Sequence, residues 1–164
     1  MAKHTSEDFQ DYYPDDVAHC YGCGRLNEQG HQLKSHWEGE ETVARFTPKP
    51  YHTAVPGYVY GGLIASLIDC HGTGTASAVA ARAEDWQPDV EPAPPGEIPR
   101  YVTASLQVDY LRPTPLGPEL EIRGVIREAT DRKVVVAATV SAEGETTARG
   151  TVVAVRMPEG MIRP

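Results

Sequence analysis

The sequence has 164 residues, which suffices for one domain with its own hydrophobic core. Its 15 basic and 23 acidic residues give a net charge of −8, and lysine and arginine form no cluster typical of nucleic-acid binding, so we expect no nucleic-acid partner. Three cysteines are too few for the disulfide framework of a small secreted domain, and the opening residues contain no apolar signal core. We therefore expect a cytoplasmic protein with reduced thiols.

Polar and acidic residues dominate residues 1–18, which we expect to form an arm ahead of a single domain at residues 19–164. The glycine-rich segment "HCYGCGRLNEQG" is typical of a loop. Apolar and polar residues then alternate in "LKSHWEG" and in "TVARFTP", which predicts two short strands joined as a hairpin through "EGEE". The prolines and glycine of "KPYHTAVPGYV" predict a further loop.

Mostly apolar residues from Gly61 to about Arg82 predict one long helix, because the run is too long for a strand. Its length would also suit a membrane span, but Asp69, His71 and several Ser, Thr and Gly residues favour a helix buried in a domain, so we expect no membrane partner. Removing an ionised carboxylate from water is costly unless it is paired or hydrogen-bonded. Asp69 is therefore a candidate functional residue.

The segment 84–99 contains five prolines, which predict a loop without regular secondary structure that runs over the protein surface. This loop either shapes an acyl pocket, covers a subunit interface or is a solvated insertion, and Trp86 favours a loop that docks on the protein. In the strand expected next, one face carries apolar side chains and the other carries Thr103, Ser105, Gln107 and Asp109. The apolar set is Val102, Ala104, Leu106, Val108 and Tyr110.

Three more strand-like segments, "ELEIRGVIREA", "KVVVAATVSAE" and "TTARGTVVAVRM", predict an antiparallel meander. A helix that is apolar nearly all round must be enclosed, and the sheet is the available cover. We therefore predict an α+β fold in which an antiparallel sheet of about five to six strands wraps around one long central helix.

Three segments resemble, in this order, the hotdog-fold acyl-CoA thioesterases of the phenylacetate-pathway and 4-hydroxybenzoyl-CoA types: "CYGCGRLNEQGHQL", "VPGYVYGGLIASLID" and "SLQVDYLRPTPLG". The resemblance runs from about Cys20 to Val155. Its most specific part is the family's His-Gly-Gly followed by an acidic residue nine positions after the His, a spacing that Tyr60 and Asp69 share. The resemblance implies a hotdog fold, an acyl-CoA substrate, no cofactor, and a homodimer or homotetramer with sites where subunits meet.

The resemblance also implies residue roles. Asp69 takes the place of the family's general base or nucleophile, and Gly61 and Gly62 provide backbone N–H groups at the helix N-terminus as an oxyanion hole. Thr73, one turn after Asp69, shares its helical face and would position water or substrate. Tyr60 replaces the family's His; it either donates a hydrogen bond in the site or packs in the core.

Substrate-binding candidates are less specific. The Gln that assists the carbonyl in the 4-hydroxybenzoyl-CoA type aligns by count with Ala54, and its neighbours His52 and Thr53 are the available substitutes. Arg112 has the geometry to bind the phosphates of coenzyme A, but the sequence fits equally well an Arg112 that is only a surface charge at a turn. Weaker candidates of the same kind are Arg82, Arg100 and Arg132.

Two other readings compete with these roles. Cys20 and Cys23 provide half a zinc site, but the other half would have to come from scattered residues, so we predict no metal and a structural loop with buried thiols. Those scattered residues are His31, His36, Cys70 and His71. Cys70 and His71 do not suggest a nucleophile and base, because adjacent helical residues point about 100° apart.

At the level of the whole protein, the alternative to hydrolysis is a non-catalytic protein that binds acyl thioesters, which the Tyr60 replacement favours. An enoyl-CoA hydratase is disfavoured, because the sequence has no Asp and His pair with the spacing of that branch's motif.

Overall fold

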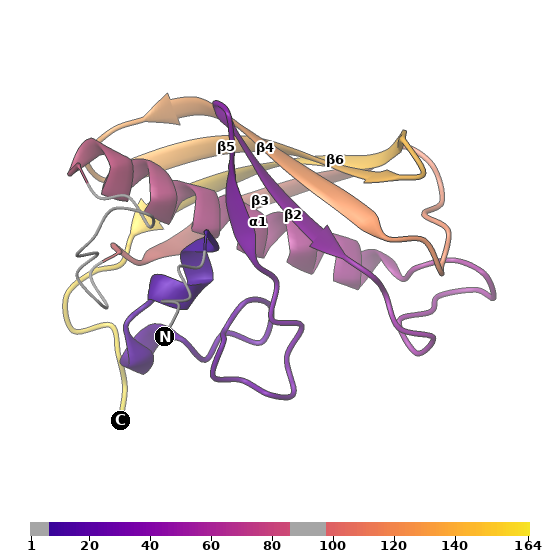
Figure 1. Ribbon diagram of the computed structural model, residues 1–164, viewed down its shortest axis with the longest axis horizontal. Coiled ribbons are helices and arrows are strands. Elements are labelled where there is room, and N and C mark those ends of the chain that lie inside the picture. The colour runs from indigo at the N-terminus through magenta and orange to yellow at the C-terminus, as the bar shows by residue number, and fades with distance from the viewer. Residues whose placement is uncertain (1–6, 86–97) are drawn as a thin grey trace, which may run out of the picture.

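The computed structural model describes residues 7–85 and 98–164 and contains one long helix and one sheet (Figure 1). Helix α1 spans Gly61–Ala83, and two short 3-10 helices, η1 (Phe9–Tyr12) and η2 (Asp15–Val17), precede the first strand. The strands are β1 (Ser35–Glu38), β2 (Glu41–Phe46), β3 (Tyr101–Tyr110), β4 (Leu120–Ala129), β5 (Lys133–Ala142) and β6 (Glu145–Arg156). Most of the proline-rich segment, with Trp86, lies outside the described residues.

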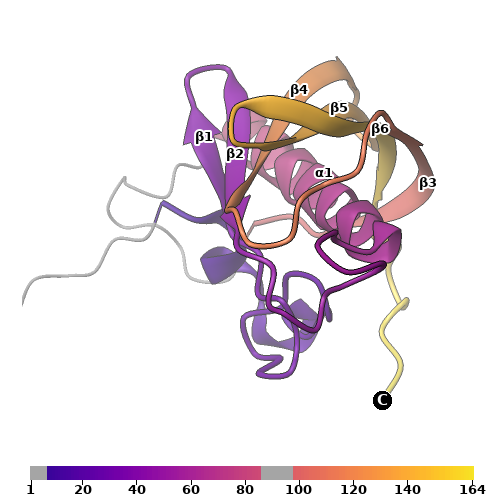
Figure 2. The same cartoon turned by 90° about the vertical axis from the view of Figure 1, so that its right-hand side faces the viewer.

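The six strands form one antiparallel sheet in the order β1-β2-β4-β5-β6-β3. The sheet curves over one side of α1, as the view in Figure 2 shows. The predicted hairpin, long helix and three-stranded meander are all present, so the α+β architecture expected from the sequence is confirmed.

Strict alternation in the meander places the core between the sheet and α1. Every second residue of β5 is buried: Val134, Val136, Ala138, Val140 and Ala142. The helix approaches β6 most closely at Gly72, where an added Cβ would lie 2.6 Å from the Val152 side chain. Such contact needs a residue without a side chain, so the glycine fixes how deeply α1 sits against the sheet.

The N-terminal segment packs against the side of α1 that the sheet leaves open. Phe9, Gln10 and Tyr13 are buried there, and a Cβ at Gly74 of the helix would lie 2.6 Å from the Gln10 amide nitrogen. Phe9 and Tyr13 therefore belong to the hydrophobic core. In the part of the chain that the structure describes, no helix is both long and apolar enough to cross a bilayer.

Strand β3 lies at the edge of the sheet and pairs only with β6 among the described strands. Its register shifts between Thr103 and Ser105. Thr103 pairs with Ala154, and Leu106 pairs with Val152, so both lie on the face toward α1. The sequence pattern put Thr103 on the opposite face; that expectation is wrong, because the irregularity interrupts the simple alternation of sides.

Candidate active site

Asp69 lies half-buried in the middle of α1, and its carboxylate faces the edge strand. The hydroxyl of Thr103 on β3 donates a hydrogen bond to Asp69 Oδ1. Burial raises the pKa of Asp69 above its ordinary value, while the Thr103 hydrogen bond and the charge of Arg100 act in the opposite direction. A half-buried carboxylate with a raised pKa is suited to accept a proton from water.

The start of α1 presents backbone donors. Tyr60 is the N-cap residue and its side chain makes no capping hydrogen bond. The first N–H groups of a helix have no partner within the helix, and the positive end of the helix dipole lies there. Gly61 and Gly62 hold these positions, and Gly62 is exposed. This end of α1 therefore offers two backbone N–H groups that an oxyanion can approach.

Two tyrosines surround this helix end. The Tyr110 hydroxyl, at the end of β3, donates to the Gly61 carbonyl at 2.7 Å. The Tyr60 ring lies against Gly62, where an added Cβ would come within 2.5 Å of Cε2, and Tyr60 is 40% exposed. Tyr60 is thus a surface residue beside the donors rather than part of the core.

The donors and the carboxylate are separated along the helix. Asp69 is seven positions after Gly62, which corresponds to about 10.5 Å of helical rise. Within one chain, the helix end and the carboxylate therefore stand about two turns apart.

The structure places the other predicted residues as follows. Thr73 is buried and its hydroxyl donates to the Cys70 carbonyl of the same helix at 3.2 Å. His52 is buried, and its Nδ1 accepts a hydrogen bond from the Lys49 N–H at 2.9 Å. Burial lowers the pKa of His52, which favours the neutral ring.

The loop of His52 is attached to the start of the helix. The Tyr60 N–H donates to the His52 carbonyl at 3.1 Å, and Thr53, which is exposed, forms a β-bridge with Val59. Arg112 forms an exposed ion pair with Glu145. The geometry thus brings His52 and Thr53 to the donor end of α1, whereas Arg112 already has a carboxylate partner.

Cys70 and His71 occupy different surroundings, as expected for neighbours on a helix. His71 is fully buried; its Nδ1 lies 2.8 Å from Ser35 Oγ and its Nε2 lies 3.0 Å from Thr42 Oγ1. Burial lowers the pKa of His71 to about 4. Cys70 instead faces the N-terminal loop, where its Sγ lies 3.8 Å from Cys20 Sγ.

Sequence reasoning missed two residues of this region, Thr103 and Tyr110. Both were assigned from alternation alone, and the hydrogen bond of each to α1 depends on how β3 lies beside the helix. The sequence signal for Thr103 is weak: it is a hydroxyl residue in the first strand after the helix that carries Asp69.

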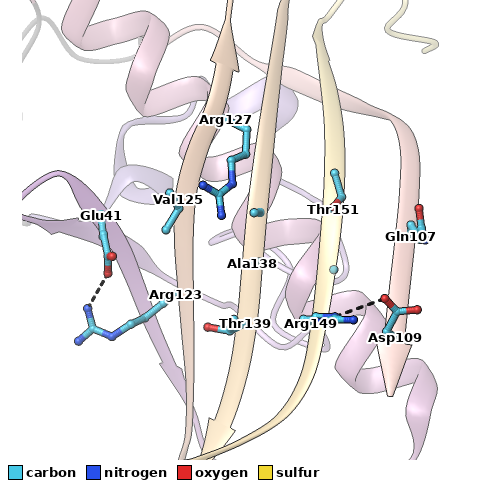
Figure 3. Close-up of a pocket in the computed structure, with 12 residues that line it drawn as sticks. Glu41, Gln107, Asp109, Arg123, Val125, Arg127, Ala138, Thr139, Arg149 and Thr151 are labelled. Atoms are coloured by element: carbon cyan, nitrogen blue, oxygen red, sulfur yellow. Dashed lines mark hydrogen bonds and ion pairs between the residues drawn. The ribbon is translucent and has the colours of Figure 1, made fainter. Parts of the chain in front are cut away.

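The outer face of the sheet carries a separate hollow of about 420 Å³, shown in Figure 3. Four of its charged residues form ion pairs, between Arg123 and Glu41 at 3.2 Å and between Arg149 and Asp109 at 3.5 Å. These residues project from the side of the sheet opposite α1 (Figure 3). The hollow is therefore distinct from the region around Asp69.

The fold has a long helix that begins with two glycines and carries a half-buried aspartate, and these features define the class of protein. This chain belongs to the Thioesterase superfamily, whose sequence pattern matches residues 56–149. It is 34% identical over 92 residues to the acyl-coenzyme A thioesterase THEM4 of Xenopus laevis, covering 56% of this chain and 33% of that protein. The chain thus spans about a third of this curated relative.

Solved structures agree with this assignment. A thioesterase superfamily protein from Shewanella loihica is 53% identical, with a TM-score of 0.65 over 88% of this chain and 98% of that one. The Escherichia coli PaaI protein of the phenylacetic acid degradation operon has a TM-score of 0.60 over 78% of this chain and 81% of that one, at 15% identity. The second likeness shows the shared fold, and with it the hotdog architecture is confirmed.

Proposed function

We propose that this protein hydrolyses an acyl-CoA thioester to the free acid and coenzyme A. The observation that carries the proposal is the half-buried Asp69, held by the Thr103 hydroxyl in the central helix of a thioesterase superfamily domain. The similarity to the Xenopus laevis acyl-coenzyme A thioesterase supports a coenzyme A ester as the substrate class.

In the proposed reaction, Asp69 takes a proton from a water molecule as that water attacks the thioester carbonyl carbon. Negative charge develops on the carbonyl oxygen, and the N–H groups of Gly61 and Gly62 stabilise it because they are fixed beforehand. Collapse of the tetrahedral intermediate breaks the C–S bond. The proton held by Asp69 then passes to the departing thiolate, which restores the carboxylate.

Nearby residues have supporting roles in this proposal. Tyr60, His52 and Thr53 line the approach to the helix start, and Tyr110 orients the first peptide group through its bond to the Gly61 carbonyl. Thr73 holds the helix backbone beside Asp69 through its bond to the Cys70 carbonyl. Arg112 would bind a phosphate of coenzyme A only by exchanging its partner Glu145.

We further propose that two chains complete each site in a cytoplasmic homodimer, which is the unit of any homotetramer. The oxyanion donors and the carboxylate lie about two turns apart on one helix. The edge strand β3 offers unpaired backbone groups, and Leu106 and Tyr110 on it are 39% and 53% exposed. Pairing of two β3 edges would bring the Gly61–Gly62 end of one helix toward Asp69 of the other.

Thiol release from a panel of acyl-CoAs tests the activity. We expect turnover of at least one of them, and we expect Asp69→Asn to reduce kcat by about 10²–10⁴-fold, the typical contribution of a general base. Glu41→Gln is a matched control, because Glu41 lies on the outer sheet face with Arg123, on β2 and away from the proposed contact at β3. Undiminished thiol release by Asp69→Asn would overturn the role of Asp69.

The alternative is an acyl-CoA binding protein without catalysis, which the exposed Tyr60 in place of a histidine favours. Binding of acyl-CoA without any thiol release, with equal affinity in wild type and Asp69→Asn, would favour that alternative. Calorimetric titration alongside the thiol assay distinguishes the two.

A further inference from the structure

Three thiols from two separate parts of the chain meet beside α1. Cys20 and Cys23 lie in the loop between η2 and β1, and Cys70 lies in the middle of the helix. The Sγ atoms of Cys20 and Cys70 are 3.8 Å apart, and all three Sγ atoms lie within 4.8 Å of one another. Cys23 and Cys70 are buried, while Cys20 is half-buried.

This spacing suits a tetrahedral metal ion. Zn–S bonds are about 2.3 Å long, so two sulfur ligands at the tetrahedral angle lie about 3.8 Å apart. A disulfide instead requires its sulfur atoms at about 2.05 Å. The observed separation of Cys20 and Cys70 therefore matches two ligands of one zinc ion.

The loop is shaped around these sulfur atoms. The Gly24 N–H donates to the Cys20 carbonyl at 2.7 Å, which closes a turn that contains both Cys20 and Cys23. At Gly22 an added Cβ would lie 2.2 Å from Cys70 Sγ, so only glycine lets the loop come this close to the helix. The closed turn and the contact at Gly22 together hold the two loop sulfur atoms beside Cys70.

The local charge also suits metal thiolates. The Arg100 guanidinium lies 4.0 Å from Cys23 Sγ and packs 4.5 Å from the centre of the Tyr13 ring. Three thiols that bind Zn²⁺ release three protons, which leaves a complex with a net charge of −1. The positive charge of Arg100 beside this complex compensates it.

We propose that Cys20, Cys23 and Cys70 bind one Zn²⁺ ion as three thiolates, with water as the fourth ligand. Soft sulfur donors favour Zn²⁺ over the oxygen-preferring Mg²⁺ and Ca²⁺. The sequence shows only the C-x-x-C half of the site, and we predicted no metal from it. The fold now brings Cys70, one of the four scattered candidates, next to Cys20 and Cys23. The ion would fasten the N-terminal loop to α1 at the residue next to Asp69, independently of which reaction the protein catalyses.

The first experiment uses the wild-type chain and the metal alone. Protein purified without chelator is analysed for bound zinc, and metal-free protein is titrated with Co²⁺ under reducing conditions. We expect about one zinc ion per chain, and with Co²⁺ a thiolate-to-metal charge-transfer band together with the strong visible bands of tetrahedral coordination.

Variants then assign the ligands. Cys70→Ser should weaken metal binding by more than the roughly 10–100-fold that loss of an outer-shell partner costs, and Cys20→Ser and Cys23→Ser should do the same. Ser66→Ala is the matched control, because Ser66 lies one turn before Cys70 and faces the same Gly22, yet carries no thiol. It should bind metal like wild type.

Three outcomes would overturn the proposal: wild-type protein that yields no zinc and no charge-transfer band with Co²⁺, native protein whose cysteines are found as a disulfide, or Cys70→Ser that binds metal as tightly as wild type. The wild-type measurements decide the question even if a variant fails to fold.

Discussion

At the scale of single residues, burial and one hydroxyl act on the ionisation of Asp69 in opposite directions. The Thr103 side chain donates to Asp69 Oδ1, which favours the charged carboxylate, whereas burial favours the neutral acid and has the larger effect. The net result is a pKa above the ordinary aspartate value. A base of this kind loses activity as the pH falls through its pKa.

Replacing Thr103 should therefore move the acid limb of the kcat/KM profile. Thr103→Val removes the donor that favours the charged carboxylate, so the pKa of Asp69 rises further and the limb shifts to higher pH. Thr103→Ser keeps the hydroxyl and should leave the limb in place. Identical profiles for the Val and Ser variants would contradict this account.

At the scale of elements, helix α1 and the β4–β6 meander could be predicted from sequence, because each is a long run with one dominant period. The position of β3 relative to α1 could not. Its register shift depends on pairing with β6, so the alternation that was correct for Leu106 and Val108 failed at Thr103. The approach of Cys70 to Cys20 likewise depends on contacts between residues 50 positions apart.

The edge position of β3 makes an element-level prediction about assembly. Leu106→Glu places a charge on the proposed subunit contact and should shift the protein toward monomers, because burying an unpaired charge is costly. Thiol release should decrease as the fraction of dimer decreases, because each proposed site needs both chains. Light scattering coupled to gel filtration measures the mass.

Ile162→Glu serves as the control for that experiment, since Ile162 is 48% exposed but lies beyond β6 in the C-terminal segment. A wild-type protein that stays monomeric at assay concentration and remains fully active would disprove the two-chain site.

At the scale of the whole molecule, a buried polar network joins the helix to the first hairpin and to the N-terminal segment. His71 bonds to Ser35 of β1 and Thr42 of β2, and the side-chain oxygen Oε1 of Gln10 accepts from the Ser35 N–H at 2.7 Å. Breaking a satisfied network of this kind leaves buried polar groups unpaired. The packing of α1, the first hairpin and the N-terminal segment therefore depends on His71 being neutral.

Global stability should consequently depend on pH through His71. Its pKa is about 4 in the folded protein, against about 6.5 when unfolded, so the unfolded chain binds the extra proton between these values. The free energy of unfolding is then full above about pH 6.5 and decreases by roughly 3 kcal/mol as the pH falls to 4. Urea unfolding across this range measures the loss.

His71→Gln isolates this contribution, because a neutral amide gains no proton on acidification. The carboxylates titrate in both proteins, including Asp69, whose raised pKa makes its own contribution to stability increase as the pH falls. The variant should be less stable at pH 7 but should lose less stability on acidification. An equal loss in both proteins would assign the acid sensitivity to other groups.

The uncapped start of α1 has a consequence for engineering. Ser, Thr, Asp or Asn at position 60 would be the standard route to a more stable helix, with a gain of about 1 kcal/mol. The same side-chain oxygen would occupy the N–H groups that the proposed oxyanion needs, and an aspartate would add charge of the wrong sign there. Tyr60 thus marks a position where thermostabilisation and turnover compete, and stabilising changes are better sought elsewhere in the chain.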